Sequence, residues 1–257
     1  MSASTFLYLR SKLQGGSDKR LTAARGRWHT LAAVTNGAGP RALSQSGFLA
    51  RLDALVTVYS LAMQAPPQQL QGRRSIMAQH AGYAAFRAVA VTADHAPAAP
   101  DAPAGPDAPA GPGAAHASAA AADGPVIAFA YGFRGADGQW WHDVVRSGLT
   151  AAGGENAAVA WLADDFEIAE VHVRPEYQRR GIGRAMLLSL TAGCPQRTAV
   201  LSTLDAPSPA RRLYRSLGFT DLLTGFGFPG NGPPYVVMGA ALPLRDSAPG
   251  RPRPSRW

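Results

Sequence analysis

The segment 167–184 holds the residues whose types and spacing most clearly indicate chemistry. A strand there ends at Val173, Pro175 forces a turn, and a helix begins near Gly181. The first N–H groups of a helix lack partners inside it and lie at the positive end of its dipole. Gly181 and Gly183 remove side chains that would hold an anion away from that backbone. Positive charge comes from three nearby arginines, Arg179, Arg180 and Arg184. The segment therefore predicts a phosphate site, and a diphosphate suits its width.

Two common phosphate-binding folds do not fit this segment. A dinucleotide fold needs a third glycine, and Met186 occupies that place. Its turn from strand to helix would also be tight and glycine-rich, whereas this turn is about seven residues long. A Walker loop requires Gly-Lys-Ser/Thr, which the sequence does not contain.

Two motifs in this order resemble a known family. Residues 173–183 read Val-x-Pro-x-x-Gln-x-x-Gly-x-Gly, which resembles the acetyl-CoA signature of the GNAT family of N-acetyltransferases. About 25 residues later, residues 210–219 read Ala-Arg-Arg-Leu-Tyr-Arg-Ser-Leu-Gly-Phe and resemble the family's second signature. The resemblance covers about residues 50–92 and 125–242, and departs from the family where Pro207 replaces a frequent Asn. It implies acetyl-CoA as cosubstrate and transfer to a primary amine by direct attack in a ternary complex.

The resemblance also implies roles for individual residues. Main-chain groups of one strand would contact the pantetheine arm and polarise the thioester carbonyl: Val171, His172 and Val173. The pyrophosphate would bind to Gln178, Arg179, Arg180, Gly181, Ile182, Gly183 and Arg184. Tyr214 would protonate or hydrogen-bond the departing thiolate, although its spacing alone, on the apolar face of its helix, is more often that of a core residue.

The reaction must also take a proton from the amine, which is almost entirely protonated at pH 7. Glu170 and Glu167 are the candidate bases, and Glu170 matches the commoner acidic position of the family. A regular strand would point them to opposite faces, because they are three residues apart, and a bulge would change that parity. Water alone is the third option.

The acceptor pocket is expected near Tyr59 and an aromatic segment, Trp140, Trp141 and His142. That segment equally fits a hydrophobic clasp over the sheet. Protein amines, aminoglycosides, amino acids and polyamines all remain open as acceptors. Cys194 has no base nearby in the sequence, so no covalent acyl intermediate is expected on it.

Helices and strands must position these groups. Apolar spacing predicts helices over residues 52–63, 70–80, 181–191 and 209–217. Strands are expected over residues 86–92, 126–132, 166–173, 198–204, 219–228 and 235–242, and residues after His142 read as an irregular Gly-rich stretch. This order predicts a mixed α/β sheet. The resemblance implies a GNAT-like, mostly antiparallel sheet of six to seven strands, splayed between two central strands, with about four helices.

The chain divides into four parts by composition. Residues 1–40 form an N-terminal extension with an uncertain strand near 28–35, and residues 41–242 form the N-acetyltransferase domain. Residues 93–124 hold 15 Ala, 6 Pro and 4 Gly, with a repeated Pro-Asp-Ala-Pro-Ala-Gly unit, and are expected to be a disordered insertion in a hairpin. Residues 243–257 form a basic tail.

Charge and cysteine content bound the function further. The formal net charge is +8, but residues 52–242 carry 13 Arg and 15 acids, so the basic excess lies at the two ends and no specific nucleic-acid binding is expected. One cysteine excludes a disulfide framework and zinc sites with two thiolates, and no metal is expected. No apolar run predicts a membrane span or a secretory signal, so a cytoplasmic protein is expected. A homodimer remains open, as does a non-catalytic acyl-CoA-binding regulatory module of the same fold.

Overall fold

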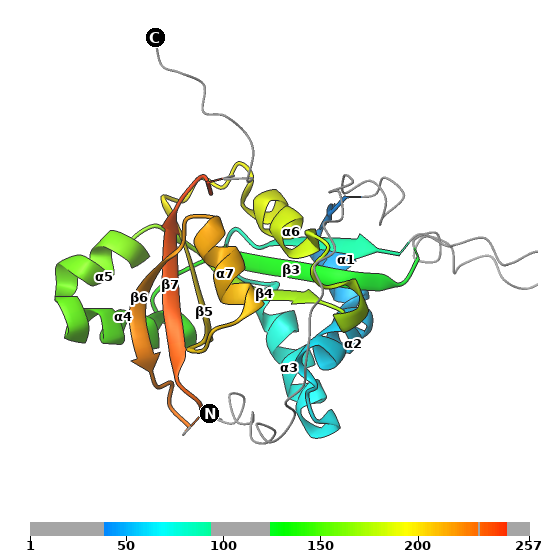
Figure 1. Cartoon of the computed structure of the whole chain (residues 1–257), viewed down its shortest axis with the longest axis horizontal. Helices are drawn as coiled ribbons and strands as arrows, with labels where there is room; N and C mark the ends of the chain where they lie inside the picture. Colours follow the sequence, from blue (N-terminus) through cyan, green and yellow to red (C-terminus); the bar gives the residue numbers. More distant parts are fainter. Residues whose placement is uncertain (1–38, 94–123, 231, 246–257) are drawn as a thin grey trace, which may run out of the picture.

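The computed structural model describes residues 39–93, 124–230 and 232–245 (Figure 1). The uncertain strand near residues 28–35 lies outside these residues, as do nearly all of the Ala/Pro-rich insertion and most of the two basic ends. The strands on either side of the insertion pair directly, and Ala93 N–H donates to Pro125 O at 2.9 Å. No helix of the described part combines the length and the apolar character that crossing a bilayer would require.

Seven strands form one mixed, mostly antiparallel sheet in the order β1-β2-β3-β4-β5-β7-β6. The strands are β1 (Arg41–Leu43), β2 (Arg87–Thr92), β3 (Val126–Arg134), β4 (Asp165–Val173), β5 (Thr198–Leu204), β6 (Thr220–Phe226) and β7 (Tyr235–Ala241). Within this described sheet, only β4 and β5 run parallel to each other. The α/β fold class predicted from the sequence is confirmed.

The helices lie on both faces of this sheet. They are α1 (Gln45–Ala50), α2 (Leu52–Met63), α3 (Pro67–His80), α4 (Trp140–Gly153), α5 (Glu155–Leu162), α6 (Ile182–Thr191) and α7 (Pro209–Ser216), with a 3₁₀ turn at Pro175–Tyr177. The described part thus holds more helices than the four or so expected. The prediction of an irregular stretch after His142 is wrong, because α4 and α5 occupy it.

Tertiary packing explains why α4 escaped the sequence reading. Gly148 interrupts its apolar pattern, and a Cβ there would lie 2.5 Å from Phe226 Cε2. The glycine allows α4 to approach β6 closely, while Val145 and Leu149 on the same helix are buried. The contact with the sheet outweighs the low helix propensity of glycine.

Alternating side chains show which helices share a face. On β5 and β7, Ala199, Leu201 and Met238 pack with α6 and α7, whereas Val200 and Val237 pack with α4 and α5. On β3, the three aromatic residues pack with α2 and α3: Phe129, Tyr131 and Phe133. Helices α6 and α7 therefore cover one face. Helices α2 and α3 cover the β2–β4 half of the other face, and α4 and α5 cover its β5–β7 half (Figure 1).

Strands β4 and β5 part soon after they begin. Three residue pairs join them, the last being Glu167↔Val200, although β4 continues to Val173 and β5 to Leu204. No further pair joins these strands in the described ranges. This divergence is the expected splay between two central strands, and it leaves the β5 side of β4 without a ladder partner.

A bulge in β4 decides where its acids point. The pairing with β3 changes from Gly132↔Ile168 to Tyr131↔Glu170, so Ala169 is an extra residue. As a result Phe166, Ile168, Val171 and Val173 all face α6. Glu167 and Glu170 then both lie on the opposite face. The bulge alternative is confirmed, and the opposite-face arrangement of a regular strand is not found.

Candidate active site

A buried ion pair fixes Glu170 beside the splay. Arg73 Nη1 of α3 lies 2.6 Å from Glu170 Oε1, and the two side chains are 15% and 9% exposed. The same guanidinium donates to Tyr59 Oη at 3.2 Å from Nη2 and lies 4.6 Å from the centre of the Tyr59 ring. Glu170 of β4 is therefore held against α2 and α3.

His172 completes this group. Its Nε2 contacts Glu170 Oε2, and its ring meets Tyr59 edge to face with centroids 5.2 Å apart. The Phe129 ring also packs on His172, with centroids 5.4 Å apart. The side chain of His172 thus contacts the candidate base, whereas the resemblance implied a role for its main chain. We call Tyr59, Arg73, Glu170 and His172 the Glu170 cluster.

Charge determines the protonation of Glu170. Burial alone would raise the pKa of this carboxyl, but the neighbouring Arg73 and His172 outweigh burial and lower the pKa to about 2. Glu170 is accordingly ionised at neutral pH. A carboxylate with so low a pKa is a weak proton acceptor by itself and a strong hydrogen-bond acceptor for His172.

Glu167 differs sharply from Glu170. Its side chain is buried, and Oε2 has no hydrogen-bond partner in the described part of the chain. Burial and then the nearby Asp165 raise the pKa of Glu167 well above its usual range. The pKa values of these two carboxyls, which share one face of β4, are therefore shifted in opposite directions.

Tyr214 reaches the same region from the other face of the sheet. It lies on α7, is buried, and packs on Phe219 with ring centroids 5.8 Å apart. Burial, followed by the charge of Glu170, raises the pKa of Tyr214 to about 12. Tyr214 is thus close enough for the charge of Glu170 to affect its pKa, and its phenol stays protonated at neutral pH.

The loop from Val173 to α6 has the backbone expected of an anion site. Gln178 Nε2 donates to Val173 O at 3.0 Å and closes the turn. Arg179 and Gly181 have φ values of 60° and 81°, in the left-handed region. The main-chain N–H groups of Gly181, Ile182 and Gly183 find no acceptor among the described residues.

Side chains of this loop take different positions. Ile182 is buried with the α6 core, so only its main chain can meet a ligand. Arg180 donates to Glu176 O at 2.8 Å, and Arg184 donates to Ser216 Oγ at 3.1 Å. A Cβ on Gly183 would lie 3.2 Å from Leu213 Cδ2, so this glycine also permits α6 to approach α7.

These features fit a coenzyme with a pyrophosphate. The glycines leave the N-terminus of α6 open, the arginines supply positive charge, and the splay leads from this end of α6 along β4 toward the Glu170 cluster. When bound, acyl-coenzyme A would supply an activated thioester.

The expected acceptor residues separate into two places. Tyr59 belongs to the Glu170 cluster. Trp141 lies on α4 and donates from Nε1 to Ser202 Oγ of β5 at 3.0 Å, beyond the last pair with β4. Trp140 is 43% exposed and packs on Phe228. His142 also lies on α4 and is buried, and no described contact links it to the Glu170 cluster.

Two residues near the site were missed by the sequence reading. Arg73 shares a helix face with Leu70, Met77 and His80, and a charged residue on an apolar face was the available signal. Tyr235 begins β7, and its charge interactions with Tyr59, Arg73 and Glu170 place it across the splay from them. Nothing in the sequence near Tyr235 indicated this approach.

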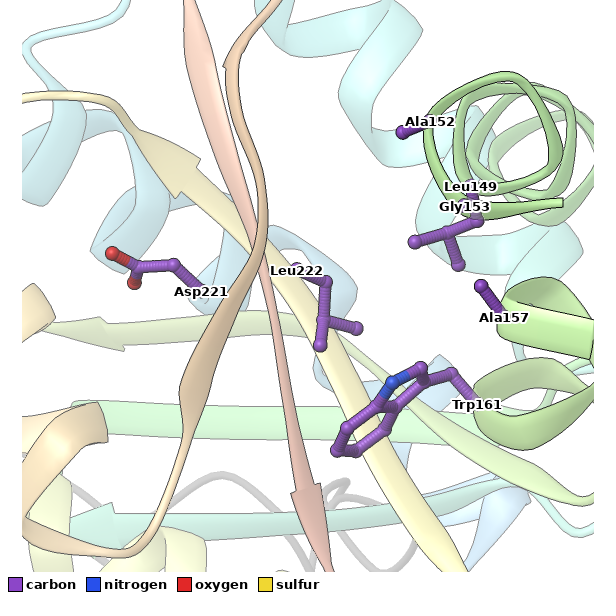
Figure 2. A pocket seen from close by; sticks show the side chains of 7 residues that line it. All are labelled: Leu149, Ala152, Gly153, Ala157, Trp161, Asp221 and Leu222. Carbon is purple, nitrogen blue, oxygen red and sulfur yellow. The ribbon is translucent and has the colours of Figure 1, made fainter.

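Two cavities lie away from these residues. One of about 240 Å³ lies between α4, α5 and β6 and is lined by Leu149, Ala152, Gly153, Ala157, Trp161, Asp221 and Leu222 (Figure 2). In Figure 2 the Asp221 carboxylate points away from Leu222 and Trp161. A second, of about 170 Å³, lies between β1, β2 and α6. Neither cavity includes a residue of the Glu170 cluster or of the α6 N-terminus.

Comparisons with known proteins identify the family. The family model described as "Acetyltransferase (GNAT) domain" matches residues 120–221. The GCN5-like protein acetyltransferase Rv2170 of Mycobacterium tuberculosis is 36% identical over 202 residues, which are 76% of this chain and 93% of that protein.

Among solved structures, an acetyltransferase from Thermus thermophilus has a TM-score of 0.47 at 12% identity, covering 80% of this chain and 98% of that one. The PaiA N-acetyltransferase from Thermoplasma acidophilum in complex with coenzyme A has a TM-score of 0.45 at 11% identity, covering 79% and 99%. Because the mycobacterial relative is 36% identical over 76% of this chain, and the family model matches residues 120–221, the chain belongs to the GNAT family of acetyltransferases.

Proposed function

We propose that the protein transfers an acetyl group from acetyl-CoA to a primary amine by direct attack in a ternary complex. One observation carries the proposal: Glu170, ionised beside Arg73, and His172 lie at the end of β4, directly before the loop that leads to the open N-terminus of α6. A proton-handling group and an anion site are thereby joined by one strand and one turn.

The α6 N-terminus would hold the pyrophosphate. Main-chain N–H groups of Gly181, Ile182 and Gly183 would donate to its oxygens, and Arg179 and Arg180 would offset its charge. Val171 to Val173 would offer main-chain groups along the splay. Gln178 would keep the turn in shape through its bond to Val173 O.

The Glu170 cluster would accept the amine proton. With a pKa near 2, Glu170 would stay ionised and orient His172 through the Nε2 contact, so that the pair together takes the proton. Glu167 is the less suitable base here, because burial raises its pKa and so favours its protonated form. Tyr214, with a pKa of about 12, would donate its proton or a hydrogen bond to the leaving thiolate.

A lysine side chain of a protein is the acceptor that we favour. Support comes from the mycobacterial relative, whose name gives it as a protein acetyltransferase. Tyr59, Trp141 and Tyr235 would surround the aliphatic part of such a side chain at the splay, as aromatic rings commonly do for amines.

Release of free thiol from acetyl-CoA tests the proposal. The full chain is assayed against lysine peptides, polyamines, amino acids and aminoglycosides, and peptides are expected to give the fastest release. Glu170→Gln and His172→Asn should each lower turnover about 100-fold. Glu155→Gln, an exposed change of the same type on α5, should leave turnover unchanged.

Two outcomes would contradict this assignment. Tight acetyl-CoA binding without thiol release across the whole panel would indicate an acyl-CoA-binding regulatory module instead. Full activity of both Glu170→Gln and His172→Asn would leave water as the proton acceptor.

A further inference from the structure

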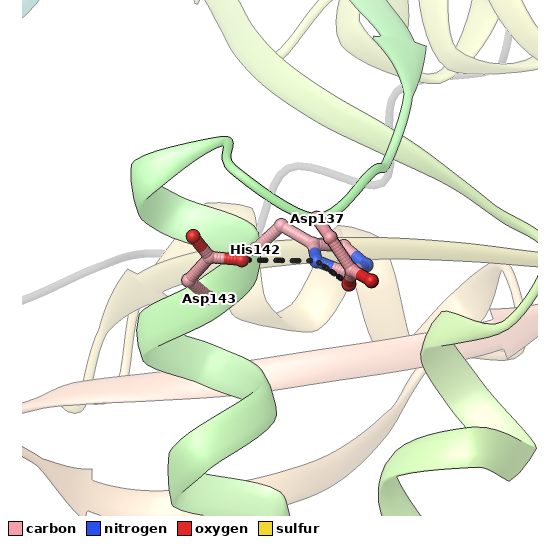
Figure 3. Close-up of side chains that lie close together, drawn as sticks. All are labelled: Asp137, His142 and Asp143. Atoms are coloured by element: carbon pink, nitrogen blue, oxygen red, sulfur yellow. Dashed lines mark ion pairs between the residues drawn. The ribbon is translucent and has the colours of Figure 1, made fainter.

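A second group of titratable side chains lies at the start of α4, away from the Glu170 cluster. It consists of Asp137, His142 and Asp143, whose ligand atoms all lie within 4.8 Å of one another. His142 Nδ1 is 3.8 Å from Asp137 Oδ1 and 3.8 Å from Asp143 Oδ1 (Figure 3). Both carboxylates approach Nδ1 of the imidazole.

Burial makes this arrangement unusual. The His142 side chain is 2% exposed, whereas those of Asp137 and Asp143 are 84% and 49% exposed. Among the described residues, Nδ1 of His142 has no hydrogen-bond partner. A buried polar atom without a partner is costly, so its position between two carboxylates calls for a cation.

The other ring nitrogen defines the state of Nδ1. His142 Nε2 lies 3.3 Å from Leu162 O, and a carbonyl only accepts, so Nε2 carries a hydrogen. In the neutral ring, Nδ1 then presents a lone pair toward the two carboxylates. Three acceptors facing one another, with a carbonyl or carboxylate behind the imidazole, is the usual surrounding of a metal-binding histidine.

Charge around the group points the same way. Asp165 is fully buried, lies 3.6 Å from His142 Nε2, and has no hydrogen-bond partner for either oxygen within the described ranges. Within the described ranges, Arg146 is the basic side chain that approaches the group. It is bound to Glu155 at 2.5 Å and comes only within 3.7 Å of Asp137. The acids therefore exceed the bases here, and a divalent ion would restore the balance.

We propose that Asp137, His142 and Asp143 bind a divalent transition-metal ion, with Zn²⁺ the best match to one imidazole and two carboxylates. Zinc binds such ligands at about 2.0–2.2 Å. Only the exposed carboxylates need to move inward, because the imidazole is fixed by packing. Gly138 N–H donates to both oxygens of Asp143, at 3.1 and 3.2 Å, and orients that carboxylate.

The expectation of no metal rested on the lack of thiolate pairs, and this set contains no thiolate. Bound metal would fasten the turn after β3 to the first turn of α4. Trp140 and Trp141 lie in that first turn, and Trp141 is bonded to Ser202 on β5. The ion would thus stabilise the start of α4, which packs on β5 beside the splay, without touching the Glu170 cluster.

Calorimetric titration of chelator-treated full chain with Zn²⁺ at pH 7 tests the proposal. We expect one site per chain and a rise in melting temperature of about 5 °C at saturating zinc. Asp137→Asn and Asp143→Asn should each weaken binding at least tenfold. Asp53→Asn, an exposed carboxylate on α2, is the matched control and should leave the zinc affinity unchanged.

Cobalt reports the ligand set without relying on activity. Co²⁺ should give the weak visible bands of nitrogen and oxygen ligation in the wild type. These bands should be absent in Asp137→Asn and in Asp143→Asn. A sulfur-to-cobalt charge-transfer band would assign the metal to Cys194 and overturn the proposal. Equal zinc affinity in the wild type and both variants would also overturn the proposal. So would a lack of zinc binding, which would leave a proton on His142 in place of the metal ion. Because none of these readouts requires acetyl transfer, failure here leaves the proposed function untouched.

Discussion

Arg73 and Glu170, 97 residues apart in the sequence, form an ion pair of 2.6 Å between α3 and β4. The pair joins the helical cover of the sheet to the strand that carries the candidate base. Because both groups are largely buried, each charge is stabilised by the other, and an isolated charge at this place would be costly in free energy. Protonation of Glu170 is thus set by a residue on a different element.

Arg73→Met should therefore raise the pKa of Glu170. With the opposing charge removed, burial dominates, so the acid side of the pH profile of kcat/KM should shift to higher pH. Leaving a buried carboxylate unpaired should also cost about 3 kcal/mol in unfolding free energy at pH 7. Steady-state kinetics over pH 5–9 and chemical denaturation measure both effects.

The adjacent arginine provides the control. Arg74 pairs with Asp53 at the surface, where both side chains are more than half exposed, so Arg74→Met should cost less than about 1 kcal/mol and leave the pH profile in place. Wild-type stability should fall between pH 4.5 and 2 as Glu170 is protonated, because its folded pKa is below its usual 4.5. An unchanged profile in Arg73→Met would show that Glu170 does not govern the rate.

Tyr214→Phe should separate chemistry from packing. The phenol ring stays in the core beside Phe219, and no described contact of its hydroxyl is lost, so the melting temperature should change by less than about 2 °C. Turnover should fall at least tenfold while the KM for acetyl-CoA changes little, because the hydroxyl acts on the leaving group. Equal turnover with a lower melting temperature would assign Tyr214 to packing alone.

Local patterns predicted the elements that carry their own signal. Strand β5 and helix α2 have the predicted bounds, because their apolar periodicity is uninterrupted. Helix α3 begins at Pro67, three residues before the predicted start, since a proline is well tolerated in the first turn of a helix. The loop from Val173 to α6 also lies where its glycines and proline indicated.

What escaped prediction depends on contacts between distant segments. Gly148 reads as a helix breaker until β6 is placed against it, and Ala169 reads as an ordinary strand residue until the register with β3 is known. Arg73 and Tyr235 approach Glu170 only through the folding of α3 and β7. Periodicity describes one element at a time, so it cannot report which side chains from other elements meet it.

Gly181→Ala should weaken acetyl-CoA binding more than it weakens the fold. Gly181 has a φ of 81°, which costs a residue with a Cβ about 1 kcal/mol, and relief of that strain would turn the α6 N–H groups away from the ligand. We expect at least a tenfold rise in the Kd of acetyl-CoA by calorimetry. Gly193→Ala is the matched control, because Gly193 has a φ of 64° near the other end of α6 and open space around it.

That control decides between two explanations. Both substitutions should lower the melting temperature by a similar amount, since both place a Cβ in the left-handed region. Only Gly181→Ala should affect the coenzyme. An equal loss of affinity in both variants would mean that general destabilisation of α6, and not its N-terminal donors, accounts for the effect.

Glu167→Gln should stabilise the protein and leave activity largely intact. The folded pKa of Glu167 is raised by burial and then by Asp165, so the folded chain holds this proton to higher pH than the unfolded chain does. Folding must then take up a proton, and the stability of the wild type falls as pH rises above about 4.5, the usual value of this group. Glutamine removes that cost, so the gain in melting temperature should be absent at pH 4 and grow toward pH 7.

The same variant bears on the proton acceptor. Glutamine cannot accept the amine proton, so full turnover of Glu167→Gln beside an inactive Glu170→Gln would assign the reaction to the Glu170 cluster. The two acids share one face of β4 because of the Ala169 bulge. Their pKa values differ because Glu167 is buried near Asp165, whereas Glu170 is paired with Arg73. A large loss of turnover in Glu167→Gln with its stability gain intact would show that Glu167 is the working base despite its raised pKa.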